Sequence, residues 1–238
     1  MRSCAKGHAV RDRKVRLTKE EIARCVAREI PDGAVVNLGI GIPTLVAQHV
    51  ARDREVIFHS ENGIIGMGPP ASPGEADREI IDASKRAVTL VEGASIVDHA
   101  TSFAIVRGGY IDVAVLGAFQ VSQHGDIANW RRPGDAVPGV GGAMDLCSGA
   151  KRVVVAMTHA EPSGAPKFVA ACTYPLTARR AVKTVYTDLA VIDILGDGLH
   201  LRELAPGWTI EEVRALTGAT LHAGHAVPEI SLAAQEAP

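Results

Sequence analysis

The spacing of apolar positions near the start of the chain predicts a helix. Ile22, Val26 and Ile30 recur at intervals of four residues, which places them on one face of a helix. Thr18 and Glu21 match the Thr-x-x-Glu capping box, in which each side chain bonds the backbone N–H of the other residue. We therefore expect the first folded element to begin at Thr18 and to bury one side.

Short apolar runs elsewhere predict strands. They occupy residues 34–38, 55–59, 88–91, 113–116, 153–156 and 189–195. The last of these runs is expected to pair with 199–202 as a hairpin, because Gly196-Asp197-Gly198 between them is a turn signal. Helices are expected after Pro43, over 101–106 and from a second capping box at Thr209, and a Gly/Pro-rich loop is expected over 66–74.

The order of these elements indicates the fold class. Strands alternate with helices in the first half of the chain, and strand signals are denser in the second half. We expect an α/β fold with an open, mostly parallel sheet flanked by helices and with extra strands in the second half. No linker or repeat interrupts the order, so a single domain is expected over 17–238. Residues 1–16 are basic and polar, which predicts a disordered leader.

Composition and charge exclude several classes of protein. The chain has 238 residues and a net charge of −2, and only 4% of its residues are aromatic, so no nucleic-acid partner is expected. No apolar stretch is long enough to span a membrane, and no secretory signal is recognised. The four cysteines are widely spaced, which favours reduced thiols and a cytoplasmic location. The nine histidines are scattered without ligand spacing, so no metal site is expected.

One acidic residue stands at the end of a predicted strand. Glu61 follows the apolar run 55–59 and precedes Asn62-Gly63, a strong turn signal. Ligands bind at such strand ends in α/β sheets. The position allows two interpretations, a structural hydrogen-bond acceptor or a nucleophile, and position alone favours the first.

Two glycine-rich turns are candidates for ligand binding. The segment 37–43 joins a strand to a helix, but it lacks the third glycine of a dinucleotide loop and the Gly-Lys-Ser/Thr of a Walker loop. The segment 138–145 has three glycines in four positions, a pattern typical of a backbone nest that binds anions or a developing oxyanion. A flexible surface loop explains the second segment equally well. No Gly-x-Ser-x-Gly motif of a serine hydrolase is present.

Taken together, these stretches resemble the B (β) subunit of the 3-oxoacid coenzyme A-transferases of family I. Residues 58–66, Phe-His-Ser-Glu-Asn-Gly-Ile-Ile-Gly, match the active-site signature of that subunit at every position. The resemblance covers roughly 18 to 220 and continues through 116–122, 125–130, 141–146, 175–177 and 187–191. It implies the CoA-transferase fold and an enzyme that needs no cofactor, since coenzyme A is its substrate.

The resemblance also implies roles for individual residues. Glu61 would be the nucleophile that forms a covalent glutamyl-CoA thioester, and the backbone N–H groups of Gly142 and Ala143 would bind the thioester oxygen. An unperturbed glutamate, with a pKa of about 4.3, is ionised at neutral pH and needs no activating base. Binding of CoA or substrate would fall to Asn62, Lys85, Gln120, Asn129 and Gly141.

The resemblance does not fix a single pair of substrates, and two other functions remain as alternatives. Succinyl-CoA is the expected donor and acetoacetate or 3-oxoadipate the expected acceptor, with an α subunit as partner in a heterodimer or heterotetramer. Ala178 and Glu161-Pro162 depart from the pattern of the family, so its substrates do not transfer directly. Two alternatives are an acyl-CoA hydrolase of the same fold and a non-catalytic ligand-sensing module.

Overall fold

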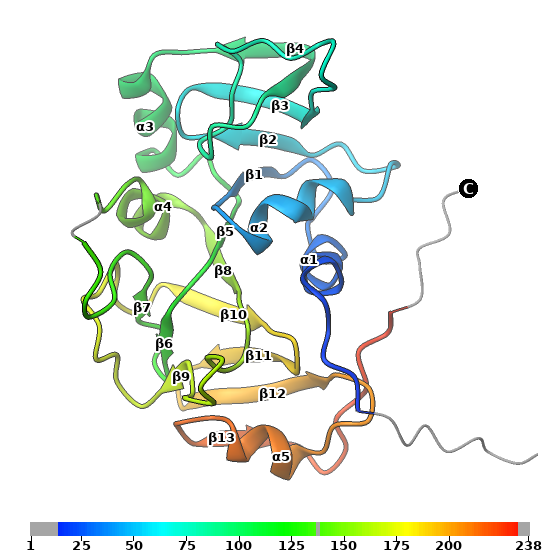
Figure 1. The fold of residues 1–238 in the computed structure, drawn as a ribbon, viewed down its shortest axis with the longest axis vertical. Coiled ribbons are helices and arrows are strands. Elements are labelled where there is room, and N and C mark those ends of the chain that lie inside the picture. The colour runs from blue at the N-terminus through cyan, green and yellow to red at the C-terminus, as the bar shows by residue number, and fades with distance from the viewer. Residues whose placement is uncertain (1–13, 137–138, 233–238) are drawn as a thin grey trace, which may run out of the picture.

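A computed structural model describes residues 14–136 and 139–232 of the chain. A twisted sheet forms the centre of the fold. Its strands are β1 (Val35–Leu38), β2 (Ile57–Ser60), β3 (Ile64–Pro70), β4 (Val88–Ile96), β5 (Val113–Leu116), β8 (Arg152–Ala156), β10 (Val182–Tyr186), β11 (Ala190–Leu195), β12 (Gly198–Leu204) and β13 (Leu221–Ala223). Within the described residues these ten strands form one sheet, in the order β13-β12-β11-β10-β8-β5-β1-β2-β3-β4 (Figure 1).

The strands in the middle of the sheet run parallel. These are β2, β1, β5, β8 and β10, and antiparallel pairs extend the sheet on both sides of them. The predicted α/β architecture is therefore confirmed, as is the hairpin between β11 and β12. Because neighbouring parallel strands point the same way, their carboxyl ends meet at one edge of the sheet.

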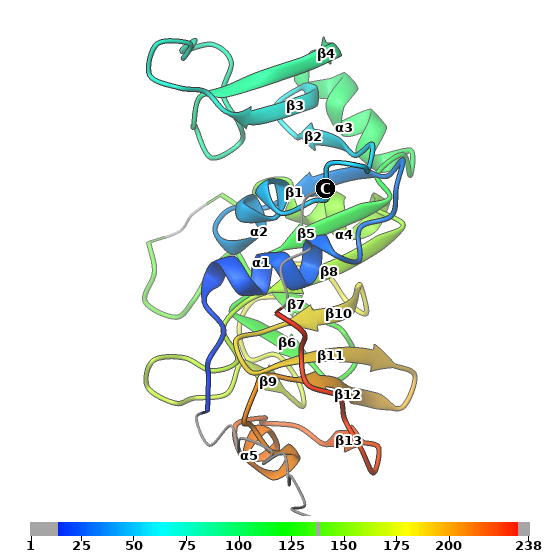
Figure 2. The same cartoon turned by 90° about the vertical axis from the view of Figure 1, so that its right-hand side faces the viewer.

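Helices cover both faces of the sheet (Figures 1 and 2). On one face lie α1 (Lys19–Ala27), α2 (Ile42–Leu45) and the 3₁₀ turn η1 (Val46–Gln48), and on the other lie α3 (His99–Arg107) and α4 (Ala143–Gly149). The short α5 (Ile210–Ala215) lies beside β13. Both predicted capping boxes, at Thr18 and Thr209, are present.

The apolar runs are continuous because both faces of the central strands are buried. In β5 all four residues are buried, and they alternate between two cores. Val113 and Val115 pack with α1, whereas Ala114 and Leu116 pack with α3 and α4. A strand turns successive side chains to opposite faces, so a strand covered on both faces has no polar position to mark its period.

The predicted loop over 66–74 is wrong in its first half, because β3 continues to Pro70. Its glycines allow the strand to pass close to β4. A Cβ placed on Gly68 would lie 2.4 Å from the hydroxyl oxygen of Thr89. The register between β3 and β4 also shifts twice, which is typical of a strand that contains glycine and proline.

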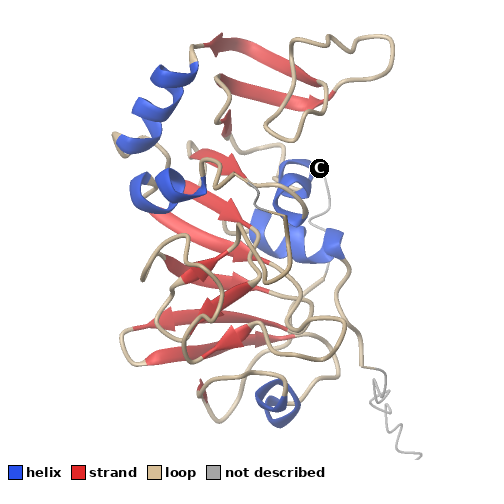
Figure 3. Cartoon of the chain, turned by 60° about the vertical axis from the view of Figure 1, so that its left-hand side comes forward, coloured by secondary structure: helices blue, strands red, loops and turns tan. Residues whose placement is uncertain are grey.

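A second, smaller sheet lies beside the main one. It contains β6 (Gln120–Ser122), β7 (Ile127–Ala128) and β9 (Phe168–Val169), in the order β7-β6-β9 within the described residues. Figure 1 labels these strands, and Figure 3 draws all strands in red. Its strands are too short to be recognised from their apolar pattern, and β10 and α4 were also not predicted. The polar segment 120–130 contributes two of these strands.

Part of the predicted leader, 1–13, lies outside the described residues. The remaining three residues contact the body of the protein: the backbone of Val15 donates to Pro206 O at 3.1 Å and accepts from the indole of Trp208 at 3.0 Å. The boundary of the predicted domain stays a prediction. No helix within the described residues combines the length and the apolar character that crossing a membrane would need.

Candidate active site

Glu61 directly follows β2, as the sequence predicted, and a tight turn comes next. Gly63 donates its N–H to Ser60 O at 2.9 Å. Its φ is +125°, a backbone conformation that residues other than glycine rarely adopt. A Cβ at this position would lie 2.2 Å from the carbonyl oxygen of Val97. The glycine is therefore needed twice, for the turn and for the close approach of the chain after β4.

A buried chain of hydrogen bonds holds the backbone of Glu61. Ser102 on α3 lies with its hydroxyl oxygen 2.8 Å from the carbonyl oxygen of Glu61 and 2.9 Å from Nε2 of His59. A carbonyl oxygen only accepts, so the single hydroxyl proton of Ser102 is donated to Glu61 and His59 must carry its proton on Nε2. Nδ1 of His59 then accepts from the amide of Asn37 at 3.1 Å. This assignment makes His59 neutral.

Burial agrees with a neutral His59, because it lowers the pKa of the imidazole from 6.5 to about 4. The unfolded chain binds this proton near pH 6.5 and the folded chain only near pH 4. Between these values the unfolded state holds more protons, so the stability of the fold decreases as the pH falls through this window. His59 alone accounts for about 2 kcal/mol of this loss at pH 5.

Replacing His59 with glutamine should therefore reduce the dependence of stability on pH. We expect the difference in free energy of unfolding between pH 7 and pH 5, measured with urea, to be smaller in His59→Gln than in the native chain. His124→Gln is the matched control, because His124 is exposed. An unchanged difference in His59→Gln would show that His59 is not held neutral by the fold.

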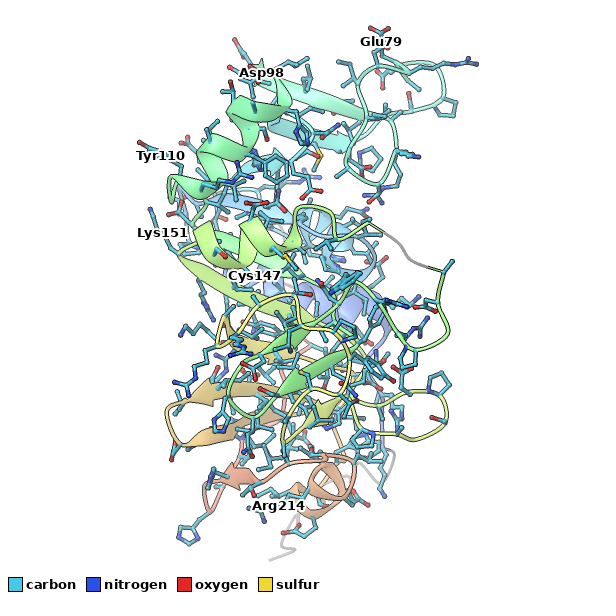
Figure 4. The ribbon with its side chains drawn as sticks, turned by 90° about the vertical axis from the view of Figure 1, so that its left-hand side faces the viewer. Glu79, Asp98, Tyr110, Cys147, Lys151 and Arg214 are labelled. Atoms are coloured by element: carbon cyan, nitrogen blue, oxygen red, sulfur yellow. The ribbon has the colours of Figure 1, made fainter. Side chains whose placement is uncertain are left out.

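The carboxylate of Glu61 lies against the start of α4. A Cβ placed on Gly142 would be only 2.4 Å from Oε2 of Glu61, so the absence of a side chain there lets the carboxylate reach the backbone. Gly141, next to it, has φ +63°. Helices α3 and α4 pack together around this point, and Figure 4 labels Cys147 on α4 and Asp98 at the start of α3.

Burial raises the pKa of Glu61 above its ordinary value. The backbone N–H of Gly142 and the nearby His99 act in the opposite direction and favour the ionised form, and Asp145 adds a smaller increase. The sequence predicted an unperturbed carboxylate, and the structure differs because the side chain is partly out of water. A more basic carboxylate is also a better nucleophile.

A cleft of about 600 Å³ opens at the carboxyl ends of the parallel strands. It is lined by the residue that directly follows each of four strands: Gly39 after β1, Glu61 after β2, Gly117 after β5 and Met157 after β8. Glu61 therefore lies where the parallel order of the sheet places ligands.

The structure brings most of the predicted site residues to this cleft. Gly141, Gly142 and Ala143 line it together with Glu61 and Asn129. The amide of Asn129 is held on both sides, since it accepts from the hydroxyl of Thr177 at 2.6 Å and donates to Gly117 O at 3.1 Å.

Gln120 lies outside the lining of the cleft. It is buried, and its side-chain oxygen accepts from the backbone N–H groups of Thr173 at 2.8 Å and Tyr174 at 3.2 Å. In this structure Gln120 fastens the loop after β9 to β6.

Asn62, next to Glu61 in the chain, contacts the loop that carries Lys85. The amide of Asn62 donates to Ile81 O at 2.7 Å, and Ala83 N donates to the hydroxyl of Ser60 at 3.1 Å, so the loop is fastened to both neighbours of Glu61. Lys85 itself is exposed and has φ +64° in this loop, outside the lining of the cleft.

Several residues of the site were not found from the sequence. Asn37, His59 and Ser102 come from three separate elements, and no local pattern links them. The charged side chains of Arg132, Glu161 and Lys167 also line the cleft. Of these three, only Glu161 carried a signal in the sequence, as a departure from the family pattern.

One group in the described part of the chain brings metal-ligating side chains together. Asp197, His200 and His222 each offer an atom within 4.8 Å of the others. They lie around the β11–β12 turn and on β13, at the opposite end of the sheet from β2 (Figure 1). This group contributes nothing to the cleft, and the expectation that the active site holds no metal stays a prediction.

Comparison with known proteins finds a match over most of the chain. The coenzyme A transferase family model matches residues 19–216. The B subunit of 3-oxoadipate CoA-transferase from Acinetobacter baylyi is 49% identical over 207 residues, which cover 87% of this chain and 95% of that protein. The B subunit of succinyl-CoA:3-ketoacid coenzyme A transferase from Helicobacter pylori is 44% identical over 201 residues, 84% of this chain and 97% of that protein.

Solved structures share the fold at lower identity. An acyl-CoA transferase from Escherichia coli O157:H7 matches with a TM-score of 0.72 at 23% identity, over 92% of this chain and 45% of its own. The present chain thus spans about half of that one. The decarboxylase AibA/AibB matches with a TM-score of 0.69 at 21% identity, over 90% of this chain and 88% of its own. At these identities the likeness shows the fold alone, and a fold does not define a reaction.

Proposed function

Because this chain belongs to the coenzyme A transferase family, we propose that it is the B subunit of an enzyme that transfers coenzyme A from an acyl-CoA to a carboxylic acid, with Glu61 as the covalent nucleophile. The observation that carries the proposal is the position of the Glu61 carboxylate, in a cleft at the carboxyl ends of the parallel strands and against the backbone of Gly142. No cofactor is required, since coenzyme A is itself a substrate.

The reaction proceeds through two covalent states. A carboxylate oxygen of Glu61 attacks the thioester carbon of the acyl-CoA, the carbon–sulfur bond breaks, and an acyl–glutamyl anhydride and the CoA thiolate result. The thiolate attacks the glutamyl carbon of the anhydride, which releases the first carboxylate and leaves a glutamyl-CoA thioester. A second carboxylate reverses both steps and leaves as the new acyl-CoA.

Residues around Glu61 have distinct parts in this scheme. The backbone N–H groups of Gly142 and Ala143 donate to the thioester oxygen as it becomes an oxyanion, and one such donor lowers the barrier by about 3 kcal/mol. Ser102 and His59 hold the backbone of Glu61, so that its carboxylate stays aligned with the incoming carbon. Apolar residues of the cleft, among them Ile40 and Phe119, limit the access of water to the anhydride.

The names of the relatives support the proposed partner and substrates. Two of them are named as the B subunits of 3-oxoadipate and of succinyl-CoA:3-ketoacid CoA-transferases, and an Escherichia coli relative, 43% identical over 84% of this chain and 92% of its own, is named as the beta subunit of acetate CoA-transferase. We infer an α subunit that completes the enzyme as a heterodimer or heterotetramer. Succinyl-CoA is the proposed donor, with acetoacetate or 3-oxoadipate as acceptor, and the proposed location is the cytoplasm.

The glutamyl-CoA intermediate can be trapped. When the purified complex with its α subunit is incubated with succinyl-CoA and no acceptor acid, we expect this chain to gain the mass of coenzyme A less one water. Digestion and mass spectrometry should place the addition on Glu61, and borohydride should reduce the thioester to an alcohol. A complex that turns over but carries no addition would contradict the covalent mechanism.

The same incubation separates the transferase from a hydrolase. A transferase releases no net thiol with or without an acceptor acid, because the CoA sulfur passes into the glutamyl-CoA thioester and then into the new acyl-CoA. Without an acceptor it releases a burst of succinate, up to one equivalent per site. An acyl-CoA hydrolase would release thiol continuously, with acetoacetate having no effect. A ligand-sensing module would show neither burst nor turnover.

A further inference from the structure

The cleft contains two cationic side chains that the transfer steps do not use. The side chains of Lys167 and Arg132 both line it, close to Glu161. Among the ion pairs of residues 14–136 and 139–232, none involves Lys167, and Arg132 has only Asp135, at 3.6 Å. The Lys167 side chain is partly buried and has no carboxylate oxygen within 4.0 Å among the described residues, so a ligand carboxylate that came closer would stabilise its charge.

The backbone holds Lys167 so that its side chain faces the cleft. Its N–H donates to His159 O at 3.3 Å, and its carbonyl accepts from Val121 N at 2.9 Å, so the residue is fixed on both sides beside β6. The next residue, Phe168, is fully buried in the core. Successive side chains of an extended segment point to opposite sides, and Lys167 therefore projects away from the core.

Arg132 is fixed by an aromatic ring of the same cleft. Its guanidinium lies 4.8 Å from the centre of the Phe119 ring, and Asp135 accepts from its backbone N–H at 3.0 Å. Burial is the main cause that lowers the pKa of Lys167, Glu161 opposes it, and the like charge of Arg132 adds to it. The three groups are thus close enough to act on one another.

We propose that Lys167 and Arg132 bind a second carboxylate, at the end of the acyl group opposite the thioester, so that the cleft selects dicarboxylic acyl groups. This inference rests on the proposed transferase function, because it assigns the acyl group to the cleft of Glu61. A carboxylate between the two cations gains charge-assisted hydrogen bonds. An acyl group that ends in a methyl leaves both cations without a partner, and sites of this kind reject the analogue that lacks the polar group.

Succinyl-CoA and butyryl-CoA test this selection, because they share chain length and differ in the distal carboxylate. With the complex of this chain and its α subunit, we expect Lys167→Met and Arg132→Met each to lower kcat/KM for succinyl-CoA by about 10- to 100-fold. The value for butyryl-CoA should change less than about twofold, and Lys167→Arg should retain much of the preference. Lys183→Met and Arg131→Met are the matched controls, since Lys183 is exposed on β10 and Arg131 lies outside the lining of the cleft.

The outcomes separate the possible sources of the anion. Both thioesters carry the same coenzyme A, so an equal loss with succinyl-CoA and butyryl-CoA would assign the cations to the CoA phosphates or to contact with the α subunit and overturn the proposal. Glu161→Gln removes the neighbouring negative charge, and we expect it to lower KM for succinyl-CoA several-fold without changing that for butyryl-CoA.

A binding measurement keeps this test independent of turnover. In the Glu61→Ala background no covalent step is expected, and isothermal titration should show succinyl-CoA binding about 10-fold or more tightly than butyryl-CoA. Adding Lys167→Met should abolish the difference. If the transferase assay fails but this difference is present, the carboxylate site stands and the proposed reaction does not. If Lys167→Met leaves the binding difference unchanged, the carboxylate site is refuted even with an active transferase.

Discussion

Replacing Glu61 with glutamine should reduce CoA transfer by about 10⁴-fold or more, because a neutral amide cannot attack the thioester. Glutamine keeps the shape of the side chain, so the cleft and the contact with Gly142 should persist. The measurement is the initial rate of acyl-CoA formation by the complex with its α subunit. Glu92→Gln, on an exposed position of β4, is the matched control and should retain full activity.

The stability of the same variant tests whether the loss is chemical. Burial raises the pKa of Glu61, which means that the ionised carboxylate is less favourable in the folded chain than in the unfolded chain. At neutral pH the charge therefore reduces stability, and Glu61→Gln should unfold at the same or a higher urea concentration than the native chain. An inactive variant that unfolds at lower urea would instead indicate a structural role. Full transfer activity in Glu61→Gln would show that Glu61 is not the nucleophile.

Replacing Gly142 with alanine should reduce transfer by about 100-fold. The new Cβ would lie 2.4 Å from Oε2 of Glu61 and 2.9 Å from the ring of Phe103, so the carboxylate must move out of its position. The backbone of Gly142 has φ −82°, which alanine adopts readily. The expected effect therefore comes from the displaced carboxylate and not from backbone strain.

A neighbouring glycine provides the control for this variant. Gly139 lies in the same glycine-rich segment, and a Cβ placed on it has no atom within 4 Å. Gly139→Ala should therefore retain activity within about threefold. Measuring the single-turnover rate of glutamyl-CoA formation in both variants locates the effect. If Gly142→Ala forms the intermediate as fast as Gly139→Ala, the close approach of Gly142 to Glu61 has no part in the first covalent steps.

Local sequence patterns predicted the elements whose signals lie within a few residues. The capping box at Thr18, the apolar run of β5 and the turn at Gly63 are all determined by neighbours along the chain, and all are present. The resemblance to the B subunits of CoA-transferases is confirmed by the family model and the relatives. Elements with weak local signals were missed, such as α4, which begins in a glycine-rich segment, and the two-residue β9.

The sequence by itself determined that Glu61 stands at a strand end before a turn, because strand and turn are local properties of the chain. Tertiary structure alone decided what surrounds it. The parallel order β2-β1-β5-β8 brings Gly142 to its carboxylate, and helix packing brings Ser102 to its carbonyl. The same packing places Lys167 in the cleft of Glu61. These contacts depend on which strands become neighbours and on how deeply each group is buried, and no spacing along the chain encodes either.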